Sequence, residues 1–191
     1  MLYAYRVGTS ETLRLENFNL LMYCMSIRNL NAQWIVGFTD GEGCFNLDVH
    51  VKKDMKWGLQ IQPEFTIVQH EIDIEVLYAL KTYFNCGSVS KNRSDHNGIR
   101  YHYKVKSVHQ RTENIVPFFE KHLLQTKKSK EFEVFKKICV LMHSNYHRNS
   151  LSNFLEIIDL GENLRVRANP KKQNSKRNNV NLIVSKLRIA V

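Results

Sequence analysis

Residues 45–52 alternate apolar and polar side chains without a break, and the alternation resumes over residues 59–67. A repeat of two residues is typical of a β-strand with one buried face and one exposed face. Pro63 falls on the apolar side of the second run. Because proline has no N–H to donate to a neighbouring strand, its presence favours an edge position or a bulge. The two runs therefore predict a first β-hairpin.

A second hairpin is predicted by residues 87–92 and 100–106, which flank the turn sequence Asp95-His96-Asn97-Gly98. An Asn-Gly pair suits the type I′ turn that joins two antiparallel strands. Apolar residues at helical spacing predict helices over residues 30–43, 73–85, 107–122, 129–144 and 151–164, with Pro117 interrupting the third. The order begins α-ββ-α-ββ-α-α and ends with one further helix. It indicates an α+β domain, in which one four-stranded antiparallel sheet is backed by helices on one face and open on the other.

The open face of this sheet is rich in side chains that donate and accept hydrogen bonds. Gln, Asn, Arg and Lys are the side chains best able to read adenine and guanine edges in the major groove, and Asp or Glu can accept from the cytosine amino group. Ordinary solvation of a sheet face is the alternative explanation. The predicted DNA-reading residues are Asn46, Asp48, His50, Lys52, Gln60, Gln62, Glu64, Thr66, Ser88, Ser90, Asn92, Arg100, His102, Lys104 and Lys106.

Composition narrows the class of protein. The chain has 191 residues, of which 43% are hydrophobic, and a formal net charge of +10. Its four cysteines form no CxxC pair, which argues against a disulfide scaffold or a structural zinc ribbon and favours a reducing compartment. No apolar run approaches the roughly 20 residues of a membrane span, so no membrane partner is expected. These features indicate a soluble, intracellular, basic single domain.

The charge is concentrated at the C-terminal end. Residues 163–191 contain eight Lys and Arg residues and no acid, so they account for eight of the ten net positive charges. A basic segment of this kind, taken here as a tail over residues 165–191, favours nucleic acid as a partner, although solvation alone would also explain it. Apolar residues within 181–191 leave open a helix or strand docked on the body. Residues 1–29 are interpreted as an N-terminal extension, because they resemble neither a secretory signal nor a typical transit peptide.

The segment with the clearest chemistry is residues 34–43, which read WIVGFTDGEG. Gly37 and Gly41 lie one helical turn apart and allow a second helix to approach closely. Glu42 lies in the last turn, where the helix dipole is negative, and a carboxylate beside exposed carbonyls there suits a hard divalent cation. Two such helices packed side by side would bring two carboxylates together at a shared metal site.

This segment resembles the motif of the LAGLIDADG homing endonucleases, in the variant that ends GF-x-DGEG. The predicted element order over residues 31–164 resembles that of the family, as do the segments 63–69 and 124–128. The resemblance implies that Glu42 binds the catalytic metal with the Gly41 carbonyl, and that Asp40 supports the motif helix. It also implies that Gln69 orders water near the scissile phosphate, and that Lys127 or Lys128 stabilises developing negative charge. Alternatively, Gln69 is an ordinary polar residue at the end of a strand, and the lysine is a solvated residue at the start of a helix.

The motif occurs once, and single-motif members of this family resemble half-enzymes that dimerise through the motif helix. The resemblance therefore implies a C2 homodimer whose interface includes Trp34, Gly37, Phe38 and Gly41. The expected substrate is a long, roughly palindromic double-stranded DNA site. The expected reaction is hydrolysis of one phosphodiester in each strand with Mg²⁺ as the cofactor, or Mn²⁺ as a substitute. The resemblance also implies that the protein is encoded by an intron of a mitochondrial or chloroplast genome.

Two other functions remain open. The same fold could serve as an RNA maturase that assists folding of its own group I intron, which the basic surplus outside the sheet favours. The intact acidic end of the motif argues against a purely splicing role. An inactive DNA-binding relic is the second alternative. His143 and His147 are spaced to bind a metal from one helix face, but no third ligand is evident and no HExxH glutamate is present.

Overall fold

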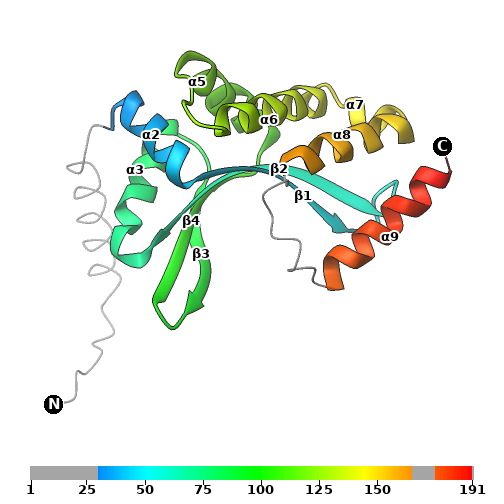
Figure 1. The fold of residues 1–191 in the computed structure, drawn as a ribbon, viewed down its shortest axis with the longest axis horizontal. Coiled ribbons are helices and arrows are strands. Elements are labelled where there is room, and N and C mark those ends of the chain that lie inside the picture. Colours follow the sequence, from blue (N-terminus) through cyan, green and yellow to red (C-terminus); the bar gives the residue numbers. More distant parts are fainter. Residues whose placement is uncertain (1–29, 165–174, 191) are drawn as a thin grey trace, which may run out of the picture.

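Four antiparallel strands form one sheet in the order β1-β2-β4-β3 (Figure 1). The computed structural model describes residues 30–164 and 175–190, so the predicted extension over residues 1–29 lies outside it. The strands are β1 (Gly43–Val51), β2 (Leu59–His70), β3 (Ser88–Asp95) and β4 (Gly98–Val105). The two predicted hairpins are therefore confirmed, and β2 and β4 pair at the centre of the sheet.

The register of the first hairpin separates a buried face from a polar face. β1 and β2 pair continuously from Gly43 opposite Ile67 to Val51 opposite Leu59. Phe45 and Phe65 are paired and buried, whereas their neighbours in sequence are turned towards the opposite face and are more exposed. The alternation read from the sequence is therefore confirmed along this hairpin.

Pro63 lies at an edge position, as the sequence predicted, although β2 is a central strand over residues 65–70. It is paired with Leu47 of β1, but the pairing of β2 with β4 extends only as far as Phe65. Residues 59–63 of β2 therefore have a neighbouring strand on one side only. The Pro63 carbonyl accepts a hydrogen bond from the Arg111 guanidinium instead of from a strand. Proline is tolerated here because β4 has already ended.

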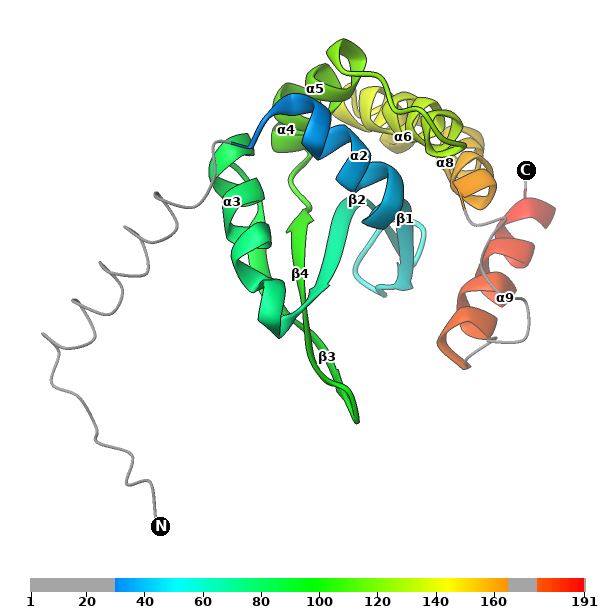
Figure 2. The ribbon, with the colours of Figure 1, turned by 60° about the vertical axis from the view of Figure 1, so that its left-hand side comes forward.

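Helices cover one face of the sheet, and the β3–β4 hairpin extends away from them (Figures 1 and 2). The segment predicted as one helix over 107–122 is divided into α4, a π-helical turn η2 and α5, with Pro117 in the first turn of α5. The helical elements are α2 (Ala32–Glu42), η1 (Glu71–Asp73), α3 (Ile74–Phe84), α4 (Val108–Gln110), η2 (Arg111–Ile115), α5 (Val116–Lys121), α6 (Lys128–His143), α7 (Tyr146–Asn149), α8 (Leu151–Leu164) and α9 (Ser175–Ile189).

The helix layer buries two groups of apolar residues against the sheet. One group surrounds Phe45 and Phe65, whose rings contact Phe119 of α5 at centroid distances of 5.6 Å in both cases. The other group surrounds Leu47 and includes α8 and α9. At Gly161 of α8, a Cβ atom would lie 2.3 Å from the Leu47 side chain, so only glycine permits this close packing of α8 on β1.

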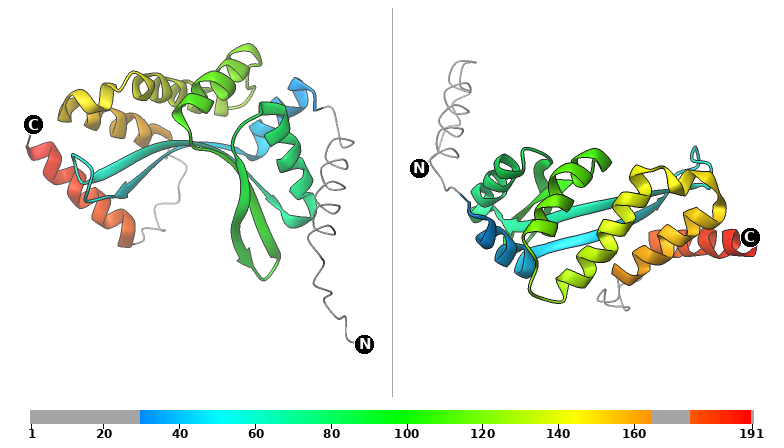
Figure 3. Two further views of the ribbon diagram at one scale, coloured as in Figure 1. Left: turned by 180° about the vertical axis from the view of Figure 1, so that it is seen from behind. Right: turned by 90° about the horizontal axis from the view of Figure 1, so that it is seen from above.

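Residues 175–189 are a helix packed on the body of the domain rather than a free basic tail. α9 contacts β1 and α8, and its Val180 and Val184 are buried with exposed fractions of 8% and 5% (Figure 3). Arg188 donates a hydrogen bond of 2.5 Å to Asp159 of α8. The docked helix that the sequence left open is therefore the arrangement found, and residues 165–174 lie outside the described part of the chain.

Within the two described ranges, no helix is both long enough and apolar enough to cross a lipid bilayer. Cys86 and Cys139 are buried free thiols, and Cys44 is an exposed one.

Candidate active site and nucleic-acid interface

The motif helix α2 ends abruptly at the point where β1 begins. Its first turn is capped by Asn31, whose side-chain oxygen accepts a 2.7 Å hydrogen bond from the Trp34 N–H. At the other end, Gly43 leaves the helix with an extended backbone while its N–H donates to the Thr39 carbonyl. A Cβ at Gly43 would lie 2.5 Å from the Thr39 side chain, so this turn requires glycine. Glu42 is thereby fixed as the last residue of the helix, with an exposed side chain.

Asp40 fastens the end of α2 to the segment that precedes α6. Its carboxylate accepts hydrogen bonds from the Gln125 N–H at 2.8 Å and from the Thr126 hydroxyl at 2.8 Å, with the Thr126 N–H at 3.3 Å. A carboxylate that receives several N–H and O–H donors is a strong anchor because the hydrogen bonds are charge-assisted. Asp40 is therefore occupied in joining two elements and is not free to bind a metal.

This anchor places Lys128 beside the motif. The Lys128 ammonium donates to the Gly43 carbonyl, and the residue is 8% exposed. Lys127 is exposed, and its carbonyl takes part in the first turn of α6. The sequence left two lysines as candidates, and the one that lies next to the α2–β1 junction is Lys128.

Glu42 is free to take a ligand. Its side chain makes no hydrogen bond or ion pair with the part of the chain that the structure describes. An exposed carboxylate together with the carbonyl groups at the end of a helix is an all-oxygen donor set, which fits Mg²⁺ or Ca²⁺. Yet residues 30–164 and 175–190 contain no group of three or more acidic, His or Cys side chains placed to hold a metal.

Gln69 lies at the same end of the sheet. Gly43 is paired with Ile67, and Gln69 follows two residues further along β2, where it is paired with Tyr101 of β4. The alternation along β2 places Gln69 on the side of Phe65 and Ile67, which is the side of the helix layer. It is half-buried. Its predicted role in ordering water remains a prediction.

One face of α2 is uncovered in the described structure. Gly37 and Gly41 are exposed, and a Cβ added at either position would meet no atom within 4 Å. Trp34 and Phe38 flank them with stacked rings, at a centroid distance of 4.6 Å and an angle of 20°. Trp34 remains 37% exposed. The four residues predicted for a dimer interface thus form one continuous, accessible apolar stripe.

The open face of the sheet carries most of the residues predicted to read DNA, but Glu64 has a different environment from the one expected. It is 7% exposed, and its carboxylate lies 3.1 Å from Lys104 Nζ and 3.6 Å from Lys106 Nζ. The Glu64 carboxylate is thus engaged by two ammonium groups in the free protein, and base reading by Glu64 stays a prediction.

Other predicted readers are paired across neighbouring strands. His50 Nε2 lies 3.0 Å from the side-chain Oε1 of Gln60 on β2, and His50 Nδ1 lies 3.5 Å from Asp48 Oδ2 on its own strand. On the second hairpin, His102 Nε2 lies 3.0 Å from the Ser90 hydroxyl. Burial, reinforced by the positive charge of Lys104, lowers the pKa of His102 below its ordinary value.

A bulge in β3 changes which side chains reach the open face. Lys91 is paired with Tyr101, but the next pair joins Arg93 to Arg100, so Asn92 falls between them. Arg93 therefore lies opposite a residue predicted on the DNA-reading face, although strict alternation placed it on the other side. A bulge of this kind cannot be recognised from the alternation of apolar and polar residues. It is seen only in the pairing of the strands. Lys52 lies just beyond β1 rather than within it.

Comparison with known proteins agrees with this geometry. Residues 35–139 match the family model described as LAGLIDADG endonuclease. A Neurospora crassa protein named "Probable intron-encoded endonuclease 2" is 33% identical over 131 residues, which cover 68% of this chain and 28% of that protein. The chain thus spans less than a third of that relative's length.

Solved structures agree in the same way. The homing endonuclease I-TnaI superposes with a TM-score of 0.69 at 35% identity, over 84% of this chain and 100% of that chain. A structure of I-SmaMI, bound to an uncleaved DNA target in the presence of calcium ions, gives a TM-score of 0.66 at 28% identity, over 85% of this chain and 49% of that chain.

Proposed function

Because this chain belongs to the LAGLIDADG endonuclease family, we propose that it is a homing endonuclease that makes a site-specific double-strand break in DNA. The observation that carries the proposal is the junction of α2, β1 and α6. There the exposed Glu42 carboxylate directly precedes Gly43, and the buried Lys128 ammonium donates to the Gly43 carbonyl. An intron of a mitochondrial or chloroplast genome is the source we propose, since the relatives carry intron-encoded names.

The residues at this junction have separate tasks in the proposed reaction. Glu42 and the Gly41 carbonyl would hold a divalent cation, which we take to be Mg²⁺; a bound metal of this kind activates water and neutralises charge on the phosphate. Lys128 would place a positive charge near the phosphodiester as negative charge develops. Gln69 would orient the attacking water from the end of β2.

We further propose that two copies assemble through α2. The exposed Gly37 and Gly41 let two helix backbones approach closely, and the stacked Trp34 and Phe38 offer apolar surface on both sides. A two-fold axis between the α2 helices of the two copies would bring the two Glu42 carboxylates together, so that both copies contribute to one metal site. It would also join the two sheets into one long, roughly palindromic DNA-binding surface.

The open sheet face would read the target. Arg93, Arg100 and Lys104 supply the donors suited to guanine edges, and Gln60 and Gln62 supply groups suited to adenine. In this proposal Glu64 holds Lys104 and Lys106 in place. Replacement of a reading residue should alter the preference at particular base pairs by about 1–3 kcal/mol.

Plasmid cleavage tests the proposed function directly. A supercoiled plasmid carrying the joined sequences that flank the gene's intron should be linearised by the wild-type protein in Mg²⁺ and left intact in EDTA. Glu42→Gln should abolish cleavage while DNA affinity stays within about tenfold, because the carboxylate serves the metal and not the sheet contacts. Glu75→Gln, which removes a carboxylate on α3, is the matched control and should cut normally. A Glu42→Gln variant that cuts at the wild-type rate would refute the assignment.

An RNA maturase for its own intron is the second candidate. It is favoured by the eight basic residues in 163–191, although Arg188 is paired with Asp159 and is not available to an RNA. Intron splicing assayed with wild-type and Glu42→Gln protein separates the two functions, since a maturase does not require the metal carboxylate. Splicing stimulated equally by both proteins, without plasmid cleavage, would favour the maturase.

A further inference from the structure

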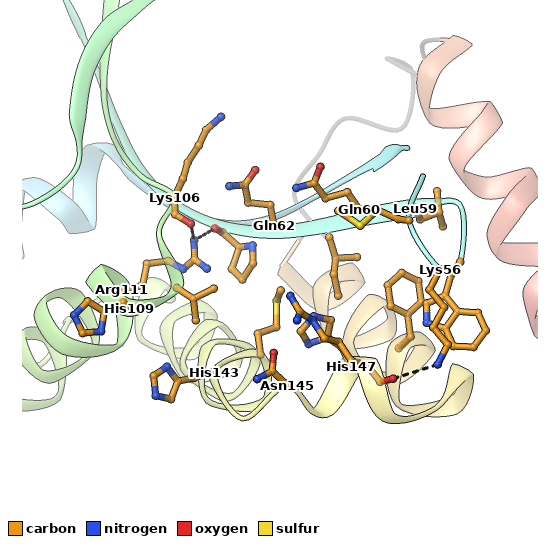
Figure 4. A pocket seen from close by; sticks show the side chains of 18 residues that line it. Lys56, Leu59, Gln60, Gln62, Lys106, His109, Arg111, His143, Asn145 and His147 are labelled. Atoms are coloured by element: carbon orange, nitrogen blue, oxygen red, sulfur yellow. Dashed lines mark hydrogen bonds between the residues drawn. The ribbon is translucent and has the colours of Figure 1, made fainter. Parts of the chain in front are cut away.

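A cavity of about 600 Å³ lies beneath the stretch of β2 that β4 no longer pairs (Figure 4). Its walls come from the β1–β2 loop, from β2, and from the helical segments around α4, α6 and α7. The volume lies in the range of sites that bind small molecules. No residue of the α2–β1–α6 junction lines it, so the cavity is distinct from the candidate active site.

The lining is basic. Lys56, Lys106, Arg111 and Arg148 contribute to it together with three histidines, and none of its lining residues in the described part of the chain is acidic. The two nearby carboxylates are already engaged. Glu64 is paired with Lys104 and Lys106, and Glu113 lies 2.8 Å from His109. Among the described residues, the lining cations Lys56 and Arg148 have no acidic partner, so the cavity is positively charged even though Lys106 and His109 are paired.

Arg111 is the strongest indication of a ligand. It is 0% exposed; its Nη1 donates to the carbonyls of Pro63 and Lys106, and the Cys139 thiol lies beside the guanidinium. Its Nε and Nη2 have no hydrogen-bond partner, and the buried Nδ1 of His147 has none either. Figure 4 shows Arg111 pointing into the cavity from one end, with His147 towards the other end. Buried charged donors without partners are costly, and an anion held between them would satisfy them.

Another part of the lining is apolar, beside the polar Gln60, Gln62 and Asn145. Leu59, Ile61, Met142 and Phe154 form part of it, and the Trp57 ring lies 6.3 Å from the Phe154 ring. A ligand with both an anionic group and an apolar ring would match these two parts of the lining. A nucleotide has this combination, with a phosphate for a planar guanidinium and a base for an aromatic wall.

We infer that this cavity binds one nucleotide, with its phosphate at Arg111 and its base against the apolar wall that includes Trp57. The nucleotide is either free in solution or part of a DNA strand that leaves the sheet. The second source is accessible because Gln60, Gln62 and Lys106 belong both to the cavity and to the predicted DNA-reading residues. Only this second source rests on the proposed function.

Isothermal titration of the full chain with deoxyadenosine 5′-monophosphate and with deoxyadenosine tests the inference. The monophosphate should bind at least tenfold more tightly, because only it reaches the Arg111 donors. Arg148→Gln changes an exposed lining residue that makes no side-chain hydrogen bond or ion pair with the described residues, so the variant should fold normally. It should weaken monophosphate binding about fivefold, whereas Lys121→Gln, an equal charge loss on α5 outside the cavity, should leave it unchanged.

Arg111→Gln should abolish the preference for the monophosphate. If that variant does not fold, because Arg111 also holds Pro63 and Lys106, Arg148→Gln decides the question. Equal binding of nucleoside and monophosphate, or unchanged binding in Arg148→Gln, would overturn the inference.

Competition with the target duplex distinguishes the two sources. A duplex that displaces the monophosphate identifies a DNA strand as the occupant, and independent binding identifies a free nucleotide. Normal cleavage of the plasmid without any binding of the monophosphate would refute this inference and leave the proposed function intact.

Discussion

Two neighbouring lysines that look equivalent in the sequence have different surroundings in the fold. The Lys128 ammonium is buried at the Gly43 carbonyl, while Lys127 is exposed at the start of α6. Lys128→Met should therefore lower the cleavage rate about 100-fold, the usual effect of removing one preorganised charge or donor at a reacting group. Lys127→Met, the matched control, should stay within a few-fold of wild type. Single-turnover cleavage measures the rates, and equal losses in both variants would show that neither position is special.

His102 gives a second prediction at the residue scale, on how the free energy of unfolding depends on pH. Burial and the charge of Lys104 lower the pKa of His102, and Glu64 opposes this only in part. The unfolded chain therefore takes up a proton near pH 6.5 while the folded protein does not. The free energy of unfolding should fall as the pH drops below about 6.5. Denaturant titrations from pH 7.5 to 5 should show a weaker decline for His102→Gln than for the wild type. A variant that follows the wild-type curve would contradict the assignment to His102.

At the scale of elements, the informative case is α9. Its basic residues attract attention in the sequence, yet its attachment depends on two valines that are buried against β1 and α8. The helix is thus part of the folded domain, and its removal would expose apolar surface in addition to removing charge. A truncation at residue 164 therefore does not measure electrostatic DNA binding alone.

A matched pair of substitutions separates these contributions. Val184 is 5% exposed and Leu182, on the same helix, is 57% exposed. Val184→Asn should lower the free energy of unfolding by about 2 kcal/mol, because it removes buried apolar atoms and inserts a polar group without a partner. Leu182→Asn should change it by less than about 0.5 kcal/mol. Urea unfolding gives both values; similar values for the two variants would mean that α9 is not docked in solution.

At the scale of the whole molecule, the uncovered face of α2 predicts an assembly. An added side chain at Gly37 meets no atom within 4 Å in one copy. Gly37→Leu should therefore leave the single subunit folded and slightly more helical, since leucine favours a helix by up to about 1 kcal/mol over glycine. It should nevertheless block close approach of two α2 helices and abolish both dimerisation and cleavage. Sedimentation and circular dichroism check the two parts separately. A Gly37→Leu protein that still sediments as a dimer would exclude this interface.

Much of this protein follows from local sequence pattern. The period of two over residues 45–67, the Asn-Gly turn and the helical spacing depend on short-range backbone geometry, so they predicted the two hairpins, the main helices and the open polar face. The position of Glu42 at the end of α2 follows in the same way, because Gly43 must leave the helix beside Thr39.

Other features depend on contacts between residues far apart in the chain, which no local pattern records. Asp40 meets Thr126 across 86 positions, and that contact places Lys128 rather than Lys127 beside the motif. The bulge that turns Arg93 to the open face and the burial of Glu64 between two lysines arise where β4 meets β3 and β2. The burial of Arg111 arises where η2 meets β2. The physical reason is that burial and hydrogen-bond partners are set only when the sheet and helices pack together. The sequence alone predicts which side of a regular strand or helix each residue is on.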